Sequence, residues 1–222
     1  MQNPFQYFSR HLERVQLFTV KTPTVFRMGY PGKAAEFYDT LERSRIPFTL
    51  EAAVHNFGKE IAWYMAMPIS VYPLIEHNLK KALPGTEMYA MHDYNLFSVG
   101  HAVEAGYLVP KNKTTEASGE MTAFSRMAKE LSTVELLGES ASFQVISKPE
   151  KRGSAMNMRL VTSANTPFRA REVFDTAAQS FKNFKAVRVK NEDFIDQFSY
   201  HIFEPKQKVV LQGGELSQIF HF

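Results

Sequence analysis

The sequence predicts an α+β fold of two tandem units, on two observations. Strand-like segments, alternating or wholly apolar, are separated by segments whose apolar residues recur at helical spacing. The order strand, helix, strand, strand, helix, strand occurs over residues 23–100 and again over residues 101–212. This order is typical of a ferredoxin-like unit, in which both helices cover one face of an antiparallel sheet. The expected organisation is therefore a lead-in at 1–22, the two units, and a linker at 213–222.

Composition narrows the possible classes of function. The chain has 222 residues, no cysteine and a net charge of +3. The length allows a sizeable core, and the lack of cysteine excludes disulfides, thiolate zinc sites and cysteine nucleophiles. The basic residues are scattered among nearly as many acidic ones, which favours a solvated surface over a dedicated nucleic-acid-binding face. No apolar run reaches about 18 residues, so no membrane-spanning helix is expected.

The lead-in contains a short amphipathic pattern. Within residues 4–18, Phe5, Phe8, Leu12 and Val15 lie near one helical face. We expect a helix that packs on the domain, on a membrane or on a partner, and the sequence does not choose among these surfaces.

The first unit opens with a strand expected in residues 22–31. A helix follows, because Ala34, Phe37, Tyr38 and Leu41 recur at i, i+3, i+4 and i+7, which is the stripe of a helix packed on a core.

Two strands, a helix and a strand complete this unit. In "FTLEAAVHN" apolar and polar residues alternate, which predicts a strand with one solvated face, whereas "IAWYMAMP" is apolar on both faces and predicts a central strand. Ser70 is a candidate N-cap for a helix in residues 71–83, and Pro73 suits its first turn. The closing strand is "TEMYAMHDY".

The second unit repeats the pattern. "EAGYLVP" is a strand, residues 120–137 are a helix, and "SASFQVISK" and "MNMRLVTSA" are two strands. Thr166 and Pro167 predict the start of another helix, which "KAVRVK" follows as the last strand. "FSYHIFEP" and "KVVLQ" are further strand-like segments, and Gly213 with Gly214 predicts a flexible joint.

The turn between the two strands of the second unit has two interpretations. A Gly-Ser pair suits a natural hairpin turn, yet "RGSAM" at 152–156 is also typical of an engineered or cloning-derived joint.

The motifs of common catalytic sites are incomplete. "GYPGKA" has only two residues between its glycines, and Ala34 rather than Ser or Thr follows Lys33, so it is not a phosphate-binding loop. "GESAS" lacks the second glycine of a nucleophile elbow. The 7 histidines stand far apart in sequence. We therefore expect no catalytic, cofactor-binding or metal-binding residue.

One group of basic residues is a candidate contact surface for nucleic acid or a partner protein. Two of its members start the last helix of the second unit and the others follow its end, where cations also favour the helix dipole. Ferredoxin-like sheets can bind RNA, although no RNP-like run is present. The group consists of Arg169, Arg171, Lys182, Lys185, Arg188 and Lys190.

Several stretches occur in an order that resembles a known family. They are "IPFTLEAAVHNFGKEIAWYMAMP", "IEHNLKKALPGTEMYAMHDY", "LLGESASFQVISKPEKR", "MRLVTSANTPFRAREVFDTAAQSFKNF" and "GELSQIFHF". Together they resemble the N-terminal, pre-motor region of a bacterial conjugative, type IV secretion-like DNA-transfer ATPase family, over most of residues 24–222. The ATPase domain of that family carries the phosphate-binding loop, which this sequence lacks.

The resemblance implies a non-catalytic domain that serves assembly, motor positioning or partner contact in a membrane-associated DNA-transfer machine. It implies no enzyme activity and no cofactor in this segment, and a cytoplasmic location at the inner face of the membrane. The implied partners are the motor domain and other secretion-system components, with a homo-oligomer, nucleic acid or membrane contact as further expectations. Leu216, Ile219 and Phe220 would dock on the motor. The resemblance does not indicate which cargo such a machine would transport.

Two alternatives to this function stay open at the level of sequence. One is a stand-alone nucleic-acid-binding module, which salt-dependent binding would reveal. The other is a small enzyme whose site forms only in three dimensions, which turnover or a deep pocket with convergent polar groups would reveal.

Overall fold

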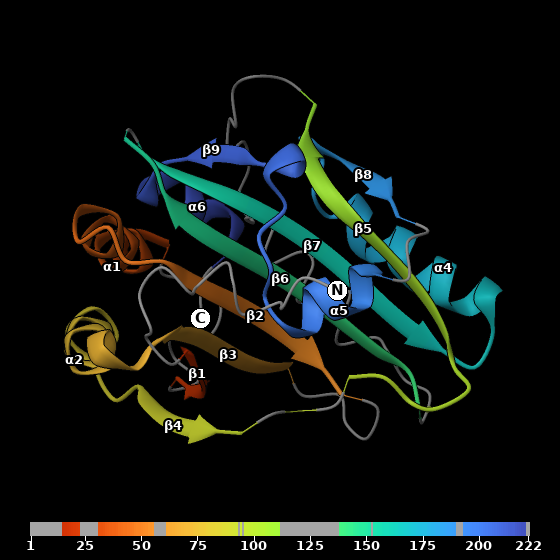
Figure 1. Ribbon diagram of the computed structural model, residues 1–222, viewed down its shortest axis with the longest axis horizontal. Coiled ribbons are helices and arrows are strands. Elements are labelled where there is room, and N and C mark those ends of the chain that lie inside the picture. The colour runs from red at the N-terminus through yellow and green to blue at the C-terminus, as the bar shows by residue number, and fades with distance from the viewer. Residues whose placement is uncertain are drawn as a thin grey trace.

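The protein has a mixed α+β architecture built on one nine-stranded antiparallel sheet (Figure 1). Helices cover one face of this sheet, and a short helix lies on the other. The computed structural model describes residues 15–22, 31–55, 61–92, 94, 96–111, 138–151, 153–189 and 193–220.

The strands run across the sheet in the order β4-β1-β3-β2-β6-β7-β5-β8, and β9 pairs with the start of β7. The central pair, β2 and β6, joins a half made of β1 to β4 to a half made of the later strands. The strands are β1 (Val15–Lys21), β2 (Phe48–Val54), β3 (Ile61–Pro68), β4 (Glu87–Met91), β5 (Ala102–Pro110), β6 (Ser140–Pro149), β7 (Ser154–Ala164), β8 (Phe184–Arg188) and β9 (Val209–Leu211).

Four helices pack on one face, here called the helix face, while α5 lies on the opposite face, here called the α5 face. Figure 1 shows α5 in front of the sheet, with α4 and α6 behind it. The helices are α1 (Pro31–Arg43), α2 (Tyr72–Ala82), α4 (Pro167–Gln179), α5 (Asp193–Ser199) and α6 (Gly213–Ile219), with two 3-10 turns, η3 (Ile69–Val71) and η4 (Pro205–Gln207).

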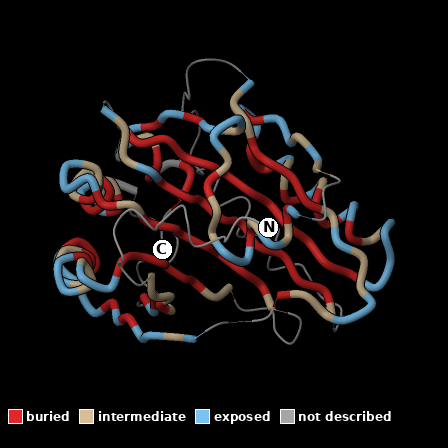
Figure 2. Tube along the Cα trace, in the orientation of Figure 1, coloured by how far each residue is buried: buried red, intermediate tan, exposed pale blue. Residues whose placement is uncertain are grey.

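The core on the helix face contains the apolar helix stripe that the sequence predicts. Ala34, Phe37, Tyr38 and Leu41 of α1 are each 1% exposed, which confirms the predicted apolar stripe. Figure 2 shows the central strands buried along most of their length, whereas exposed residues lie on the outer sides of the helices.

The two predicted helix starts differ in outcome. The Thr166 hydroxyl accepts a hydrogen bond from the Arg169 backbone N–H at 3.2 Å, so the predicted N-cap of α4 is confirmed. The predicted cap of α2 is wrong, because Ser70 lies inside η3 and the N-cap is Val71, which makes no side-chain cap bond.

The C-terminal part departs most from the sequence prediction. Residues 198–205 form the end of α5 and a connecting segment instead of a strand. Gly213 and Gly214 begin α6 instead of a joint, because Gln212 and Glu215 form a reciprocal capping box at its start.

The N-terminal prediction is corrected where the structure describes it. Val15 begins β1, so a helix does not extend over residues 15–18. The predicted helices at 4–14 and 120–137 and most of the strand expected at 22–31 lie outside the described residues.

A hairpin turn joins β6 and β7. The Glu150 N–H donates to the Gly153 carbonyl at 3.2 Å, and Gly153 has a φ of +76°, a conformation that glycine adopts without strain. Ser154 to Met156 lie within β7, paired with both β6 and β9. The engineered joint stays a prediction.

Within the described part of the chain, no helix has the length and apolar character needed to cross a bilayer. The expected location at the inner face of a membrane stays a prediction.

Candidate functional site

A line of polar side chains crosses the α5 face, one from each of five adjacent strands. Tyr64, Glu51, Gln144, Arg159 and Tyr107 stand directly opposite one another in the strand register, in this order. We call these five residues the polar row. Its three central members are between 0% and 1% exposed. Uncompensated burial of such groups is costly, so their partners decide what the row can do.

Tyr94, Ser142 and Gln144 donate hydrogen bonds to the Glu51 carboxylate. The Ser142 hydroxyl donates to Oε1 at 2.5 Å, and the Tyr94 hydroxyl donates to the same oxygen. The Gln144 Nε2 donates to Oε2 at 3.2 Å. Two donors from β6 and one from the segment after β4 thus compensate the buried charge of this carboxylate.

Gln144 links the acidic and basic members of the row. While its Nε2 donates to Glu51, its Oε1 accepts from Nη1 of Arg159 at 3.4 Å. The amide has one acceptor and one donor end, so its orientation matches the charge on each side.

The Arg159 guanidinium is held from the α5 side. Its Nη1 donates to the Gln197 carbonyl at 2.9 Å and its Nη2 donates to the Ile202 carbonyl. It also lies over the rings of Tyr107 and Phe194, 5.4 and 5.7 Å from their centroids. Burial lowers the pKa of Arg159 from its ordinary value.

One donor of Arg159 is left over. Its Nε is buried and has no hydrogen-bond partner among the described residues. Buried donors in native proteins nearly always have a partner, so the site suits a water molecule or a polar ligand atom at this position.

The segment from α5 to η4 closes the Arg159 end of the row. The Tyr107 hydroxyl donates to Gln197 Oε1 at 3.3 Å, and Asn157 exchanges two hydrogen bonds with the Glu204 backbone. His201 lies in this segment with a φ of +54°. Burial of its ring, and then the charge of Arg159, lower the pKa of His201 to about 4.

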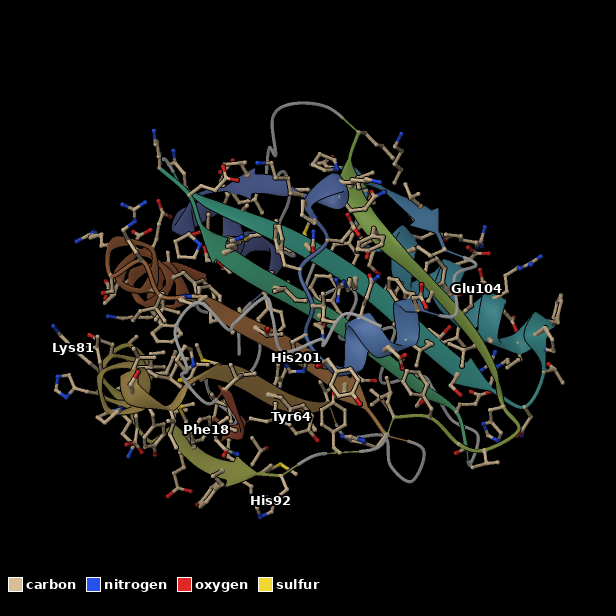
Figure 3. The ribbon with its side chains drawn as sticks, viewed as in Figure 1. Phe18, Tyr64, Lys81, His92, Glu104 and His201 are labelled. Carbon is tan, nitrogen blue, oxygen red and sulfur yellow. The ribbon has the colours of Figure 1, made fainter. Side chains whose placement is uncertain are left out.

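At the opposite end of the row Tyr64 is 4% exposed and lies beside His55 and Tyr94, and we call these three residues the open end. His55 and Tyr94 are half-buried. The Nε2 of His55 is 2.5 Å from the Tyr64 hydroxyl, and the Tyr64 ring stacks on Tyr94 with centroids 4.3 Å apart. Burial, and then the charge of Glu51, raise the pKa of Tyr64 to about 12, so its phenol stays protonated at neutral pH. Figure 3 shows Tyr64 and His201 on the α5 side of the sheet.

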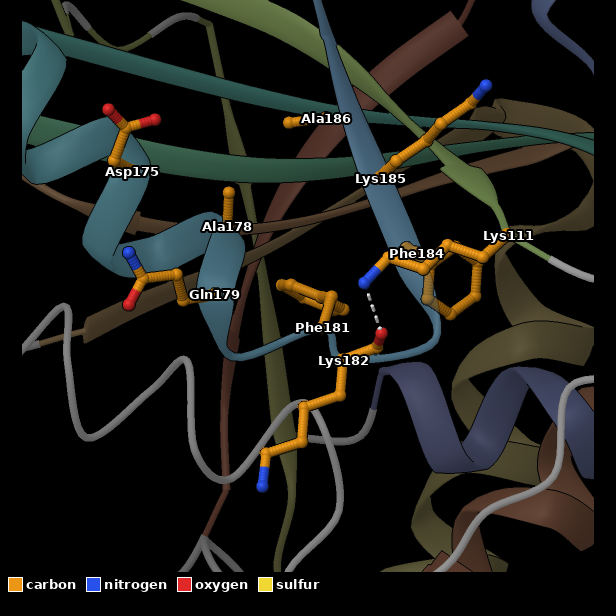
Figure 4. A pocket seen from close by; sticks show the side chains of 9 residues that line it. All are labelled: Lys111, Asp175, Ala178, Gln179, Phe181, Lys182, Phe184, Lys185 and Ala186. Atoms are coloured by element: carbon orange, nitrogen blue, oxygen red, sulfur yellow. Dashed lines mark hydrogen bonds between the residues drawn. The ribbon is translucent and has the colours of Figure 1, made fainter.

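A second feature is a hollow of about 370 Å³ at the C-terminal end of α4 (Figure 4). It lies on the helix face, away from the polar row. Its walls combine aromatic rings with three lysines, and its lining residues are Lys111, Asp175, Ala178, Gln179, Phe181, Lys182, Phe184, Lys185 and Ala186.

The predicted contact surface does not form one basic patch. Arg169 is tied to carboxylates, because its Nε is 2.7 Å from Glu139 and its Nη1 is 3.0 Å from Glu172. The hydrogen bond to Glu139 is the main cause that raises the pKa of Arg169 further above its ordinary value.

Two more of the predicted arginines share acidic partners. Arg188 binds Glu104 at 2.9 Å and also Asp175, and the Arg171 Nε is 3.7 Å from Glu104. Their charges are therefore partly neutralised within the domain.

The predicted lysines have a different environment. Lys182 and Lys185 line the hollow and form no ion pair with a described residue, while Lys190 lies outside the described residues. Contact of this group with nucleic acid or a partner stays a prediction.

The residues expected to dock on a motor lie in the core of this domain. Leu216, Ile219 and Phe220 are 1%, 3% and 0% exposed. The Phe220 ring meets Trp63 and Phe143, with centroids 5.8 and 6.1 Å away. Another domain could reach these side chains only if α6 left the core, and docking there stays a prediction.

The polar row and the open end are absent from the sequence prediction, which expected no catalytic, cofactor-binding or metal-binding residue. The sequence did contain a signal, since Gln144 and Arg159 are large polar residues in the middle of strands rich in apolar and small residues. Across the described ranges, no group of three His, Cys, Asp or Glu side chains could hold a metal ion.

The chain was compared with known families, curated proteins and solved structures. No family model and no curated protein matches it. A chitooligosaccharide oxidase is similar with a TM-score of 0.44 and 12% identity, over 78% of this chain and 46% of that one. The xylooligosaccharide oxidase from Myceliophthora thermophila C1, solved with xylobiose, has a TM-score of 0.44 and 8% identity, over 86% of this chain and 50% of its own. The 6-hydroxy-D-nicotine oxidase from Arthrobacter nicotinovorans has a TM-score of 0.42 and 14% identity, over 78% of this chain and 44% of its own.

These findings correct the family assignment. The similar structures are oxidases, not DNA-transfer ATPases, so the expected membership in that family is wrong. The expected role as a non-catalytic secretion domain is wrong with it, as is the expectation that the segment is not an enzyme. The expectation of no cofactor is corrected as well, because it rested on that family and the similar structures are oxidases. The expected partners and homo-oligomer stay predictions.

The likeness has limits that matter for function. The chain spans about half the length of the solved structures it matches. Because the TM-scores are below 0.5, the likeness does not assign an oxidase reaction to this chain.

Proposed function

We propose that this chain is an enzyme domain that performs general acid–base chemistry on a small polar substrate at the open end of the polar row. The observation that carries the proposal is the 2.5 Å contact between His55 Nε2 and the Tyr64 hydroxyl, beside the buried Glu51. An imidazole and a phenol within hydrogen-bond distance form a pair able to transfer protons, and here the imidazole is half-buried while the phenol is buried.

The two tyrosines and Glu51 have distinct proposed roles. Tyr64, with its pKa raised to about 12, would donate a proton to a substrate oxygen, and a protonated His55 would replace it. Tyr94 stacks on Tyr64, and its hydroxyl is held by a hydrogen bond to Glu51. Tyr94 and Glu51 are therefore proposed as positioning residues for Tyr64. This set of groups suits a substrate with a carbonyl or ester oxygen, on which charge develops during the reaction.

The test is turnover of a panel of carbonyl compounds and esters by the wild type and by Tyr64→Phe. We expect at least one compound to be converted, with kcat reduced 100-fold or more in Tyr64→Phe, in line with the loss of a general acid. Tyr89→Phe is the matched control, because Tyr89 is an exposed tyrosine whose hydroxyl contacts only Glu87 among the described residues. No conversion by the wild type, or equal rates in the two variants, would contradict the proposal.

We further propose that the two halves of the sheet are ferredoxin-like units. Two observations support this: the first half has the order β4-β1-β3-β2, and the second half has the equivalent order read from its other end, β6-β7-β5-β8. All of these pairs are antiparallel, as that unit requires. An experimental structure with a helix of residues 120–137 on the helix face would complete the second unit, and a strand there would contradict it.

A further inference from the structure

The hollow at the end of α4 contains an ammonium group held in a fixed place. The Lys111 backbone N–H donates to the Asn183 carbonyl at 2.8 Å, and its Nζ donates to the Lys182 carbonyl at 2.8 Å (Figure 4). Both bonds reach the same turn, so the side chain of Lys111 is fixed at both ends against the lining of the hollow. An ammonium has three donors, and only one is used here by a described residue.

The charge of the lining is positive. Three lysines face one acidic residue, Asp175, whose carboxylate binds Arg188. The C-terminal end of a helix carries a partial negative charge, which disfavours anions. Here, however, the carbonyls of Ala177 and Ala178 already accept hydrogen bonds from the following turn, so the ammonium groups dominate the local field.

The shape of the hollow suits a small molecule. Its volume of about 370 Å³ lies within the range of small-ligand sites. Phe181 and Phe184 meet edge to face with centroids 6.2 Å apart, and Ala178 and Ala186 complete the apolar wall. Figure 4 shows Lys182 and Lys185 extending in opposite directions away from Lys111, so Lys111 is the residue placed for direct contact.

We propose that this hollow binds a small molecule with a phosphate or diphosphate group, with Lys111 as the direct contact and Lys182 contributing positive charge from farther away. The two N–H groups of the Lys111 ammonium that no described residue accepts from would donate to phosphate oxygens, while the apolar wall would cover the uncharged part of the ligand. The site is separate from the proposed acid–base site, which lies on the other face of the sheet, so either can fail without the other.

The test is isothermal titration of the whole chain with sodium pyrophosphate, with ADP and with a single-stranded DNA 20-mer as separate probes. We expect pyrophosphate and ADP to bind, with affinity reduced tenfold or more in Lys111→Ala and about threefold in Lys182→Ala, and retained in Lys111→Arg. Lys81→Ala, which removes an exposed lysine at the end of α2, is the control and should bind as the wild type does.

Three results would overturn the proposal. These are no binding of either small probe at millimolar concentration, equal losses in Lys111→Ala and Lys81→Ala, and binding of the DNA probe alone. The last result would identify a nucleic-acid surface instead. Circular dichroism of each variant shows whether a loss of binding comes from loss of fold, and Lys182→Glu then tests the charge without removing Lys111.

Discussion

The two faces of the sheet bury neighbouring residues of the same strands by different means. On the helix face, Leu50 and Phe143 are 0% exposed and pack against apolar side chains. One residue along the same strands, Glu51 and Gln144 are 1% and 0% exposed on the α5 face, where hydrogen bonds compensate them. The free energy gained by burying apolar side chains does not depend on their orientation. A buried charge, in contrast, is costly once one of its hydrogen-bond or ionic partners is removed. We infer that the helix face supplies most of the stability and that the α5 face carries the function.

The largest expected effect is on the helix face. Phe220→Ala removes a ring with 0% exposure that meets Trp63 and Phe143. We expect a loss of about 4 kcal/mol in the free energy of unfolding, measured by urea denaturation. Phe168→Ala is the control, because Phe168 is 78% exposed and its loss should cost under about 0.5 kcal/mol. Equal losses would mean that α6 does not pack as described.

On the α5 face, the loss in unfolding free energy caused by a substitution depends on which charged or polar partners stay buried without it. Arg159→Met leaves the Glu51 charge buried without its compensating cation, and we expect a loss of about 3 kcal/mol. Glu51→Gln in the same chain removes that uncompensated charge, so the double variant should lose at least about 1 kcal/mol less than the sum of the single losses. Additive losses in urea denaturation would show that Gln144 does not couple the two groups.

A smaller effect should depend on pH. The pKa of His201 is about 4 in the folded protein, below its ordinary 6.5, so the folded state favours the neutral ring. This contribution is fully present above about pH 6.5 and is lost as the pH falls toward 4, for a total of about 2 kcal/mol after allowance for partial exposure. His201→Asn keeps a residue that tolerates the positive φ but does not titrate. The difference in unfolding free energy between the two proteins should therefore change over this range, and a constant difference would contradict the assignment.

Sequence patterns predicted the helix face better than the α5 face. The stripe of α1 and the cap at Thr166 are local features, so spacing alone predicts them. Glu51 alternates with apolar residues, which predicted a solvated face, yet all of β2 is buried. Its cover comes from Tyr94, which is 43 residues away, and Ser142, which is 91 residues away, and no local pattern reports such contacts.

The family resemblance failed for a related reason. The motifs that suggested it describe how strands and helices follow one another, and many unrelated α+β proteins share that order. The buried row of Tyr64, Glu51, Gln144, Arg159 and Tyr107 depends on strand register, which becomes visible only when β2 pairs with β6.

The contrast between the faces is tested most directly by measuring unfolding free energy and turnover on one variant, Tyr64→Phe. We expect stability to stay within about 1 kcal/mol of the wild type, because the ring and its stacking on Tyr94 are kept, while turnover of the best substrate in the panel falls at least 100-fold. A loss of stability above about 2 kcal/mol with unchanged turnover would show that the hydroxyl serves the fold and not a reaction.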